Sequence, residues 1–349
     1  MERMNGMSRE TLFMNAINEA LEQAMEHDEN VILLGEDIAG GAEVTHLEEA
    51  NEDAWGGVMG ITRGLAPKFG RERVIDTPLS EMGYMGAAVG MAVTGLRPVP
   101  ELMFNDFVGF CFDAIIGQGS KIRYMFGGKA KVPMTVRTMH GAGVNAAAQH
   151  SGSYYGIFGA IPGVKVVVPA TPYDAKGLLL SAIEDDNLVI FSEDKTLYSV
   201  KGEVPEDYYK VPIGKAEIKR VGEDLTIVTI GKMLYVGLEV ADLLAKDNVS
   251  VEVIDLRTVA PWDQETVLES VRKTGRLIVV DEANPHNNTA TDIASVVSDE
   301  AFDYLDGPIK CVCAPNTPVP FAANLEQLYI PDANKVLTVA AEIIDDLRA

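Results

Sequence analysis

Residues 225–257 read LTIVTIGKMLYVGLEVADLLAKDNVSVEVIDLR, and this stretch gives the clearest view of the fold. Residues 225–230 and 250–255 are short runs rich in valine and isoleucine, and residues 233–245 between them have the length and pattern of a helix. Near-continuous apolar runs are typical of strands that are buried on both faces, as in a parallel sheet. The stretch therefore predicts a strand, a helix and a second strand in the same sheet.

The same alternation of strands and helices extends in both directions along the chain. Later strands are predicted at 277–281 and 309–313, and later helices at 264–273, 292–302 and 334–347. Earlier strands are predicted at 31–34, 74–75, 99–104, 132–138, 164–168 and 188–191, and earlier helices at 9–28, 83–93, 108–124 and 173–183. This order indicates an α/β protein.

Residues 201–215 separate the two halves, because they contain Pro205 and Pro212 and show little periodicity. A chain of 349 residues also exceeds the usual length of one domain, about 100–200 residues. We therefore expect two three-layer α/β/α domains, at 1–200 and 201–349. The segment 40–60 is rich in glycine and acidic residues and is expected to be a long functional loop.

Composition narrows the classes of partner. The chain has 29 Lys and Arg against 52 Asp and Glu, a formal net charge of −23, which argues against nucleic acid because phosphates would be repelled. An acidic surface suits a basic protein partner, although solubility alone explains it equally well. No apolar run is long enough for a membrane span, and no signal peptide is recognised. Three cysteines without framework spacing favour a reducing, cytoplasmic compartment.

The stretch Asp76-Thr-Pro-Leu-Ser-Glu81-Met-Gly83 places a carboxylate between a short strand and a helix of small apolar residues. A carboxylate at a helix start can simply interact with the helix dipole. Apolar surroundings would also raise the carboxyl pKa, as a functional acid requires. Common nucleotide-binding and hydrolase motifs (GxGxxG, GxxxxGK[ST], HExxH and GxSxG) do not occur in the chain.

Several motifs follow one another along nearly the whole chain. They are Asp76-Thr-Pro-Leu-Ser-Glu81-Met-Gly-Tyr84, Gly95-Leu-Arg-Pro98, Glu101-Leu-Met-Phe-Asn-Asp-Phe107, Gln149-His150-Ser151, Pro169-Ala-Thr-Pro-Tyr-Asp-Ala-Lys-Gly177, Asp255-Leu-Arg257, Asp281-Glu-Ala-Asn-Pro285 and Thr317-Pro-Val-Pro320. In this order they resemble the beta subunits of thiamine-diphosphate-dependent 2-oxo acid and acetoin dehydrogenases. The resemblance implies a transketolase-like pyrimidine-binding domain and a transketolase C-terminal-like domain with a mostly parallel sheet.

The resemblance also implies roles for three residues. Glu81 matches a glutamate that bonds a ring nitrogen of the cofactor's aminopyrimidine, favouring the imino tautomer that removes a proton from the thiazolium carbon. Phe107 matches an aromatic residue that lies against the aminopyrimidine, although a core phenylalanine is a serious alternative. His150 matches a histidine that faces the reacting carbon, and imidazole titrates near neutral pH. Relatives often have glutamine where this chain has Gly152, so a hydrogen bond near His150 can be missing.

Two further sites are carried over from the family. His140 is a candidate for the mouth of the same site, with a structural role as the alternative. The turn 182–187 resembles a segment that holds a structural potassium ion in relatives. Hard oxygen ligands would come from five residues, with an ordinary acidic helix end as the alternative interpretation: Met134, Ala182, Ile183, Asp185 and Asn187.

A missing motif points to a partner. The family's diphosphate motif, Gly-Asp-Gly followed by Asn-Asn, does not occur in this chain. Since the diphosphate needs Mg²⁺ with carboxylate and amide ligands, the resemblance implies that an alpha subunit holds both. The active site would lie between subunits of an α2β2 heterotetramer. A lipoyl-bearing acyltransferase core would bind through its subunit-binding domain.

Three functions stay open. Segments 35–60, 123–129 and 137–143 are most similar to the acetoin dehydrogenase branch, in which acetoin is cleaved and an acetyl group passes to a lipoyl acceptor. The same chemistry on pyruvate or branched-chain 2-oxo acids is the second possibility. A non-catalytic subunit that docks the core of the complex through an acidic second domain is the third.

Overall fold

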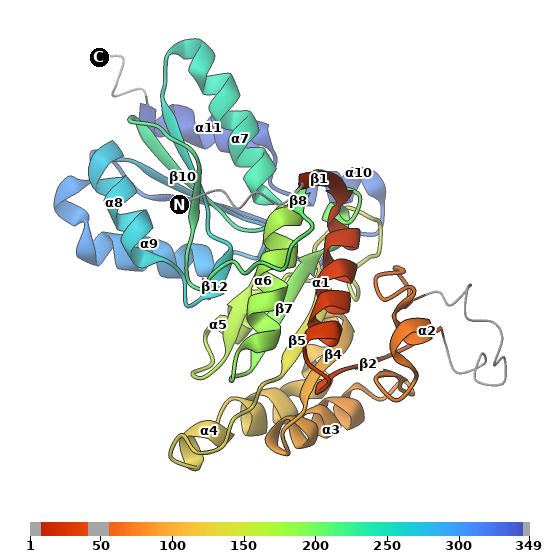
Figure 1. Cartoon of the computed structure of the whole chain (residues 1–349). Coiled ribbons are helices and arrows are strands. Elements are labelled where there is room, and N and C mark those ends of the chain that lie inside the picture. The colour runs from red at the N-terminus through yellow and green to blue at the C-terminus, as the bar shows by residue number, and fades with distance from the viewer. Residues whose placement is uncertain (1–7, 41–55, 345–349) are drawn as a thin grey trace.

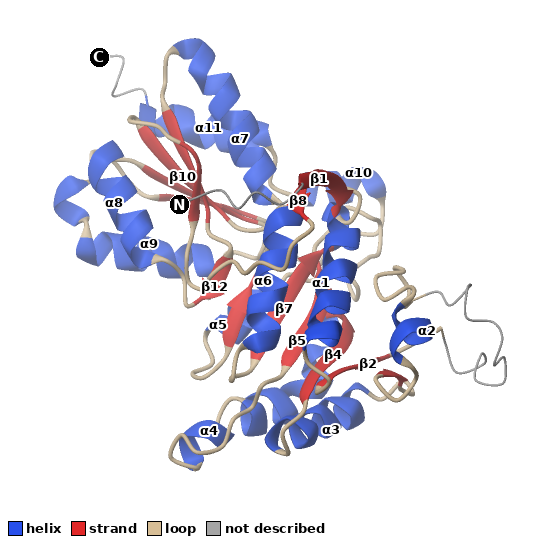
Figure 2. Cartoon of the chain, viewed as in Figure 1, coloured by secondary structure: helices blue, strands red, loops and turns tan. Residues whose placement is uncertain are grey.

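The computed structural model describes residues 8–40 and 56–344, so most of the expected loop 40–60 lies outside the described residues (Figure 1). Two mostly parallel sheets, covered by helices, form the body of the molecule (Figure 2). The larger sheet has the strand order β12-β6-β7-β5-β4-β2-β3, and the smaller has the order β14-β13-β10-β11-β9. The expected α/β class is confirmed.

The first domain is a three-layer sandwich. Its parallel strands are β2 (Val31–Gly35), β3 (Val74–Asp76), β4 (Arg97–Phe104), β5 (Thr135–His140), β6 (Lys165–Val167) and β7 (Val189–Asp194). Helices α1 (Phe13–His27) and α6 (Pro172–Glu184) pack on one face. The other face carries α3 (Glu81–Val93) and α5 (Tyr155–Gly159), while a short helix α2 spans Leu65–Phe69.

Two predictions in this domain were wrong. The helix expected at 108–124 is split into a 3-10 turn (Asn105–Cys111), a π-helical turn (Asp113–Gly119) and α4 (Ile122–Met125). Glycines weaken a regular helix here, and Gly119 lies where a β-carbon would come within 3.1 Å of the Ala114 carbonyl oxygen. The helix expected from residue 9 begins at Phe13, because β1 (Ser8–Leu12) pairs with β8 (Lys201–Pro205).

The second domain is also a three-layer sandwich. Its parallel strands are β10 (Leu225–Thr229), β11 (Val251–Asp255), β13 (Leu277–Asp281) and β14 (Lys310–Cys313), with β9 (Glu217–Arg220) antiparallel at the edge. Helices α7 (Met233–Leu244) and α11 (Ala333–Ile344) cover one face, and α8 (Gln264–Thr274) and α9 (Thr289–Glu300) the other. A short helix, α10 (Ala323–Tyr329), was not predicted.

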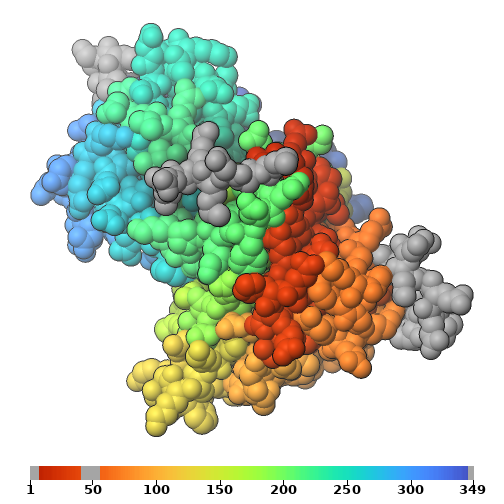
Figure 3. Space-filling view, in the orientation of Figure 1, coloured from red at the N-terminus to blue at the C-terminus, as the bar shows by residue number. Residues whose placement is uncertain are grey.

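The two domains share structure across the junction, and they pack directly against each other in the space-filling view (Figure 3). Strand β12 (Thr258–Ala260) follows β11 in the chain but pairs with β6 of the larger sheet. One hydrophobic cluster contains residues of both domains, including Val166 and Val279. The proposed division at residue 200 therefore crosses a continuous core, and it stays a prediction.

A buried ion network joins the three central strands of the larger sheet. The Arg137 guanidinium on β5 donates to Glu101 Oε2 on β4 at 2.7 Å and to Glu193 on β7 at 2.7 and 2.9 Å. The Tyr198 hydroxyl donates to the same Glu193 carboxylate at 2.8 Å. Burial raises the pKa of Glu101, and the neighbouring Arg137 opposes this rise. The network therefore depends on Arg137 to compensate two buried carboxylates.

We expect Arg137→Met to lower the free energy of unfolding by at least about 3 kcal/mol, because Glu101 and Glu193 would stay buried without a partner. Urea unfolding followed by circular dichroism measures the loss. Arg220→Met is the matched control, since Arg220 pairs with Asp242, whose side chain is 77% exposed. An equal loss in both variants would contradict the assigned importance of the network.

Candidate active site

The predicted catalytic residues gather because of the sheet. Strands β3, β4 and β5 are parallel members of one sheet, so their carboxyl ends lie at the same edge. Glu81 follows β3, Phe107 follows β4, and His150 follows β5. Each residue therefore projects from a connection at the edge where α/β proteins usually bind ligands.

Phe107 and His150 are brought into contact. Their ring centroids are 5.5 Å apart at 79°, and the ring of Phe104 lies 4.7 Å from that of His150 at 80°. Edge-to-face packing of this kind stabilises ring pairs. The Lys195 ammonium donates to the His150 carbonyl oxygen and lies 5.3 Å from the centre of the Phe104 ring. The His150 imidazole thus has a fixed, partly buried position.

Glu81 lies near this cluster without touching it through a hydrogen bond. It is the first residue of α3, and α3 packs against the turn that carries Phe107. Within residues 8–40 and 56–344, the partly buried Glu81 carboxylate has no hydrogen-bond or ion-pair partner. Burial raises the pKa of Glu36, and the charges of Asp37, Glu81 and Glu101 raise it further. An unpaired carboxylate in such a place can accept a hydrogen bond from a ligand.

His140 is placed differently from the other candidates. Its side chain is only 2% exposed, and burial lowers its pKa to about 4. Its Nδ1 lies 2.8 Å from the Ser192 hydroxyl, and its ring packs edge-on against Tyr155. His140 is therefore a neutral, structural histidine inside the protein rather than a residue at the mouth of the site.

The comparisons with known proteins agree with this geometry. Residues 10–201 match the family described as "Transketolase, pyrimidine binding domain", and residues 214–336 match "Transketolase, C-terminal domain". The chain is 57% identical to the acetoin:2,6-dichlorophenolindophenol oxidoreductase subunit beta of Bacillus subtilis (strain 168), covering 97% of this chain and 99% of that one. The chain belongs to the family of thiamine-diphosphate-dependent dehydrogenase beta subunits.

A second relative and a solved structure are also similar to this beta subunit. The pyruvate dehydrogenase E1 component subunit beta of the same Bacillus subtilis strain is 42% identical to it, over 95% of this chain and 98% of that one. A solved "split gene transketolase, inactive beta4 tetramer" superimposes with a TM-score of 0.75 at 21% identity, covering 98% and 99% of the two chains. The expected two-domain, transketolase-like fold is thereby confirmed.

The segment predicted to hold a potassium ion is paired with basic side chains of the same chain. The Lys165 ammonium pairs with the Asp185 carboxylate, and Arg123 donates to Asn187 Oδ1 at 2.9 Å. Arg97 donates to the Ile183 carbonyl at 3.0 Å. The carbonyls of Met134 and Ala182 each accept a backbone N–H, at 2.9 and 3.2 Å. The oxygens suit a hard cation in kind, and in this structure they contact basic side chains and backbone N–H groups of the chain itself. The potassium ion stays a prediction.

Steric crowding explains why residue 152 of this beta subunit is a glycine. A β-carbon at this position would lie 2.3 Å from the Tyr154 ring and 2.8 Å from Asp106 Oδ1. The Gly152 N–H donates to Asp106 Oδ2 at 3.1 Å. Gly152 is therefore held in place by its backbone N–H, and a side chain at this position would collide with Tyr154 and Asp106.

Sequence patterns alone did not single out Asp106 and Lys195, which contact the loop that carries His150. Burial raises the pKa of the Asp106 carboxyl, against the hydrogen bond from Gly152, and burial lowers the pKa of Lys195. Asp106 stands directly before Phe107 in a motif already noted, and Lys195 directly follows β7. The rule that ligands bind at the carboxyl edge of a parallel sheet could have found both.

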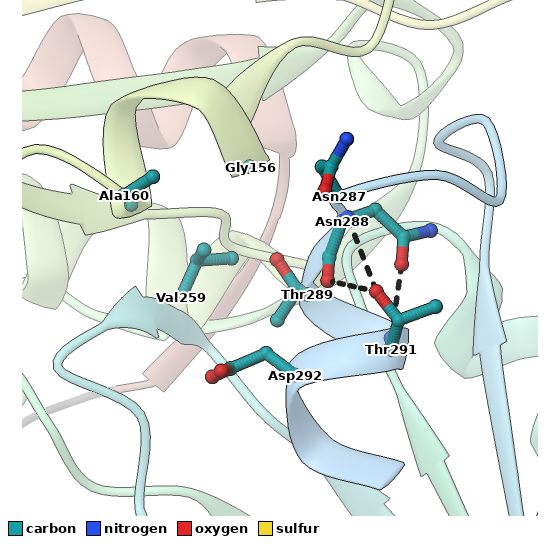
Figure 4. Close-up of a pocket in the computed structure, with 9 residues that line it drawn as sticks. Gly156, Ala160, Val259, Asn287, Asn288, Thr289, Thr291 and Asp292 are labelled. Atoms are coloured by element: carbon teal, nitrogen blue, oxygen red, sulfur yellow. Dashed lines mark hydrogen bonds between the residues drawn. The ribbon is translucent and has the colours of Figure 1, made fainter. Parts of the chain in front are cut away.

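A separate pocket of about 370 Å³ lies at the domain junction (Figure 4). Gly156 and Ala160 form one wall, and Val259 and the start of α9 form the other. At that start, Asn288 and Thr291 form a capping box, and Asp292 accepts a hydrogen bond from the Trp262 indole at 2.9 Å. The residues that line this pocket do not include Glu81, Phe107 or His150.

The buried His140 makes stability depend on pH. Its pKa is about 4 in the folded chain and about 6.5 in the unfolded chain, so the unfolded state takes up the proton first as pH falls. This group should lower the free energy of unfolding by about 1.6 kcal/mol between pH 6.5 and pH 5. We expect His140→Gln, compared with the unchanged chain by urea unfolding at both pH values, to remove that part of the pH dependence. An unchanged pH dependence would show that folding does not lower the pKa of His140.

Proposed function

We propose that this chain is the beta subunit of an acetoin dehydrogenase, which cleaves acetoin and transfers the acetyl group to a lipoyl acceptor together with an alpha subunit. One observation carries the choice of substrate. Two beta subunits of the same organism serve as references, and identity is 57% to the acetoin enzyme but 42% to the pyruvate enzyme. Both alignments cover nearly the whole of each chain, so the difference does not reflect a missing part.

The residues at the carboxyl edge have chemically distinct tasks in this proposal. Glu81 accepts a hydrogen bond at the aminopyrimidine ring, for which its carboxylate is unpaired among the described residues. Phe107 offers an apolar face to the same ring. His150, oriented by two aromatic rings and by Lys195, moves a proton at the substrate oxygen. When bound, thiamine diphosphate supplies the nucleophilic carbon that this chemistry needs.

An alpha subunit completes the site in this proposal. The chain lacks the family's diphosphate motif. No group of three or more His, Cys, Asp or Glu residues in the described part of the chain could hold a metal ion. The alpha subunit therefore binds Mg²⁺ and the diphosphate. Large apolar side chains on and near α3 and α4 support such a contact in an α2β2 assembly, since Met82, Tyr124 and Phe126 are 68%, 89% and 62% exposed.

Two wider assignments belong to the same proposal. The net charge of −23 supports docking of an acyltransferase core through a basic subunit-binding domain. No helix of the described residues could span a membrane. The free thiols of Cys111, Cys311 and Cys313 support a place in the reducing cytoplasm.

A substrate panel tests the proposal. The chain, purified together with the alpha subunit and supplied with thiamine diphosphate and Mg²⁺, should reduce an artificial dye with acetoin and only weakly with pyruvate or branched-chain 2-oxo acids. A preference for a 2-oxo acid would overturn the substrate while keeping the family.

Glu81→Gln is the variant that separates catalysis from docking in the same assay. Without the carboxylate, the hydrogen bond that activates the aminopyrimidine is weakened, so we expect turnover to fall at least about 100-fold. A complex that forms normally and turns over unchanged with this variant would favour the non-catalytic docking subunit.

A further inference from the structure

The loop that carries His150 has an unusual backbone. It spans residues 141–152, and its two ends meet where the Gly141 N–H donates to the Gly152 carbonyl. Within it, Gly143, Asn145 and Ala147 have φ values of 120°, 56° and 59°. Side-chain-bearing residues are uncommon in this left-handed region and stay there only when the surroundings hold them. The loop therefore needs a partner that fixes its N–H groups.

Glu326 of the second domain is that partner. It belongs to α10 and is 3% exposed, although residues 143–145 above it are exposed. Its Oε1 accepts the Gly143 N–H at 2.9 Å, and both carboxylate oxygens accept the Asn145 N–H, at 3.2 and 3.0 Å. Successive N–H groups of such turns form a concave site for an anion, and here the anion is a side chain.

The helix that carries Glu326 is anchored by packing and by a hydrogen bond. Tyr329, one turn further along α10, packs with Ala142, Ala314 and Val319 in a small apolar cluster, and its hydroxyl accepts a hydrogen bond from Asn284 at 3.1 Å. A second carboxylate, Glu282, accepts the Ala142 N–H at 2.6 Å. The first half of the loop is thus bound to the second domain, across the domain junction.

We propose that Glu326 is a positioning residue for His150, so that the second domain controls the geometry of a catalytic group in the first. The link is short: the His150 N–H donates to the Ala147 carbonyl, and Ala147 follows Asn145 by two residues. Lys195 and Asp106 hold only the far end of the loop, at His150 and Gly152. This inference rests on the proposed proton-transfer role of His150.

Loss of the carboxylate has a defined structural consequence. The N–H groups of Gly143 and Asn145 lose their acceptor, so the left-handed turn at Asn145 is no longer favoured over an ordinary conformation. Residues 145–149 then relax, and His150 leaves its edge-on contact with Phe104. Glu81 and Phe107 lie on other elements, α3 and the turn after β4, so we expect cofactor binding to change little.

A double-mutant cycle in the assembled holoenzyme tests the proposal. The variants are Glu326→Ala, Glu326→Gln, His150→Ala and the double variant Glu326→Ala with His150→Ala, each reconstituted with the alpha subunit, thiamine diphosphate and Mg²⁺. We expect Glu326→Ala to lower kcat about 10- to 100-fold, with little change in KM for acetoin or in cofactor affinity. Glu326→Gln keeps an amide oxygen that accepts N–H bonds and should recover part of kcat. In the His150→Ala background, removing Glu326 should cause no further loss.

Glu252→Gln is the matched control, because Glu252 is a carboxylate of the same domain that is only 1% exposed. It accepts hydrogen bonds from Lys273 and from the Gly222 N–H, which are far along the chain from the loop. This variant should leave kcat unchanged. Limited proteolysis gives a readout without activity: Glu326→Ala should be cleaved faster between residues 141 and 152, and Glu252→Gln should not.

Two results overturn the inference. Losses that multiply in the double variant would show that Glu326 acts independently of His150, and an unchanged kcat in Glu326→Ala would show that the loop needs no such support. A full kcat in His150→Ala would instead reject the proposed role of His150 itself, so the two failures are distinguishable.

Discussion

The parallel alignment of β3, β4, β5 and β7 governs where chemistry can occur in this subunit. Because all four strands point the same way, the residues that follow them reach one edge of one sheet. Glu81, Phe107, His150 and Lys195 are far apart in sequence. This single constraint brings all four to the same edge of the sheet. The Arg137 network, which joins β4, β5 and β7, keeps the three central strands in register beneath that edge.

The second domain contacts the loop that carries His150. Glu282 and Glu326 accept backbone N–H groups from the loop after β5, and Lys232 pairs with both Asp194 of the first domain and Glu282 of the second. Strand β12 adds a further connection between the domains, because it follows β11 in the chain but pairs with β6 of the larger sheet. In our proposal, these contacts make the geometry at His150 depend on how the two domains pack.

Much of the fold could be predicted from the sequence because buried parallel strands have near-continuous apolar runs. Such runs located β10, β11 and β13 to within about a residue. The errors come from interactions that a local pattern does not contain. Residues 9–12 have a helical pattern, but pairing with β8 makes them a strand, and short edge strands such as β12 have too few residues to show a period.

The site was only partly predictable for the same reason. Glu81, Phe107 and His150 could be proposed from the sequence because family motifs contain them, whereas Lys195 and Glu326 have no local signal that marks them. Glu326 lies 176 positions beyond His150, and only the folded arrangement places its carboxylate under the loop. Gly152, a departure from the family pattern, is explained by the Tyr154 ring and the Asp106 carboxylate, which occupy the space of a side chain.

We propose that this chain holds only the aminopyrimidine half of a thiamine diphosphate site. The most direct test is a calorimetric titration of thiamine diphosphate with Mg²⁺ into this chain alone, into the alpha subunit alone, and into the assembled pair. We expect tight, saturable binding by the assembled pair and at least about a 100-fold weaker affinity for either chain alone, because each lacks contacts that the other supplies. Binding to this chain alone as tight as to the pair would contradict this division of the site.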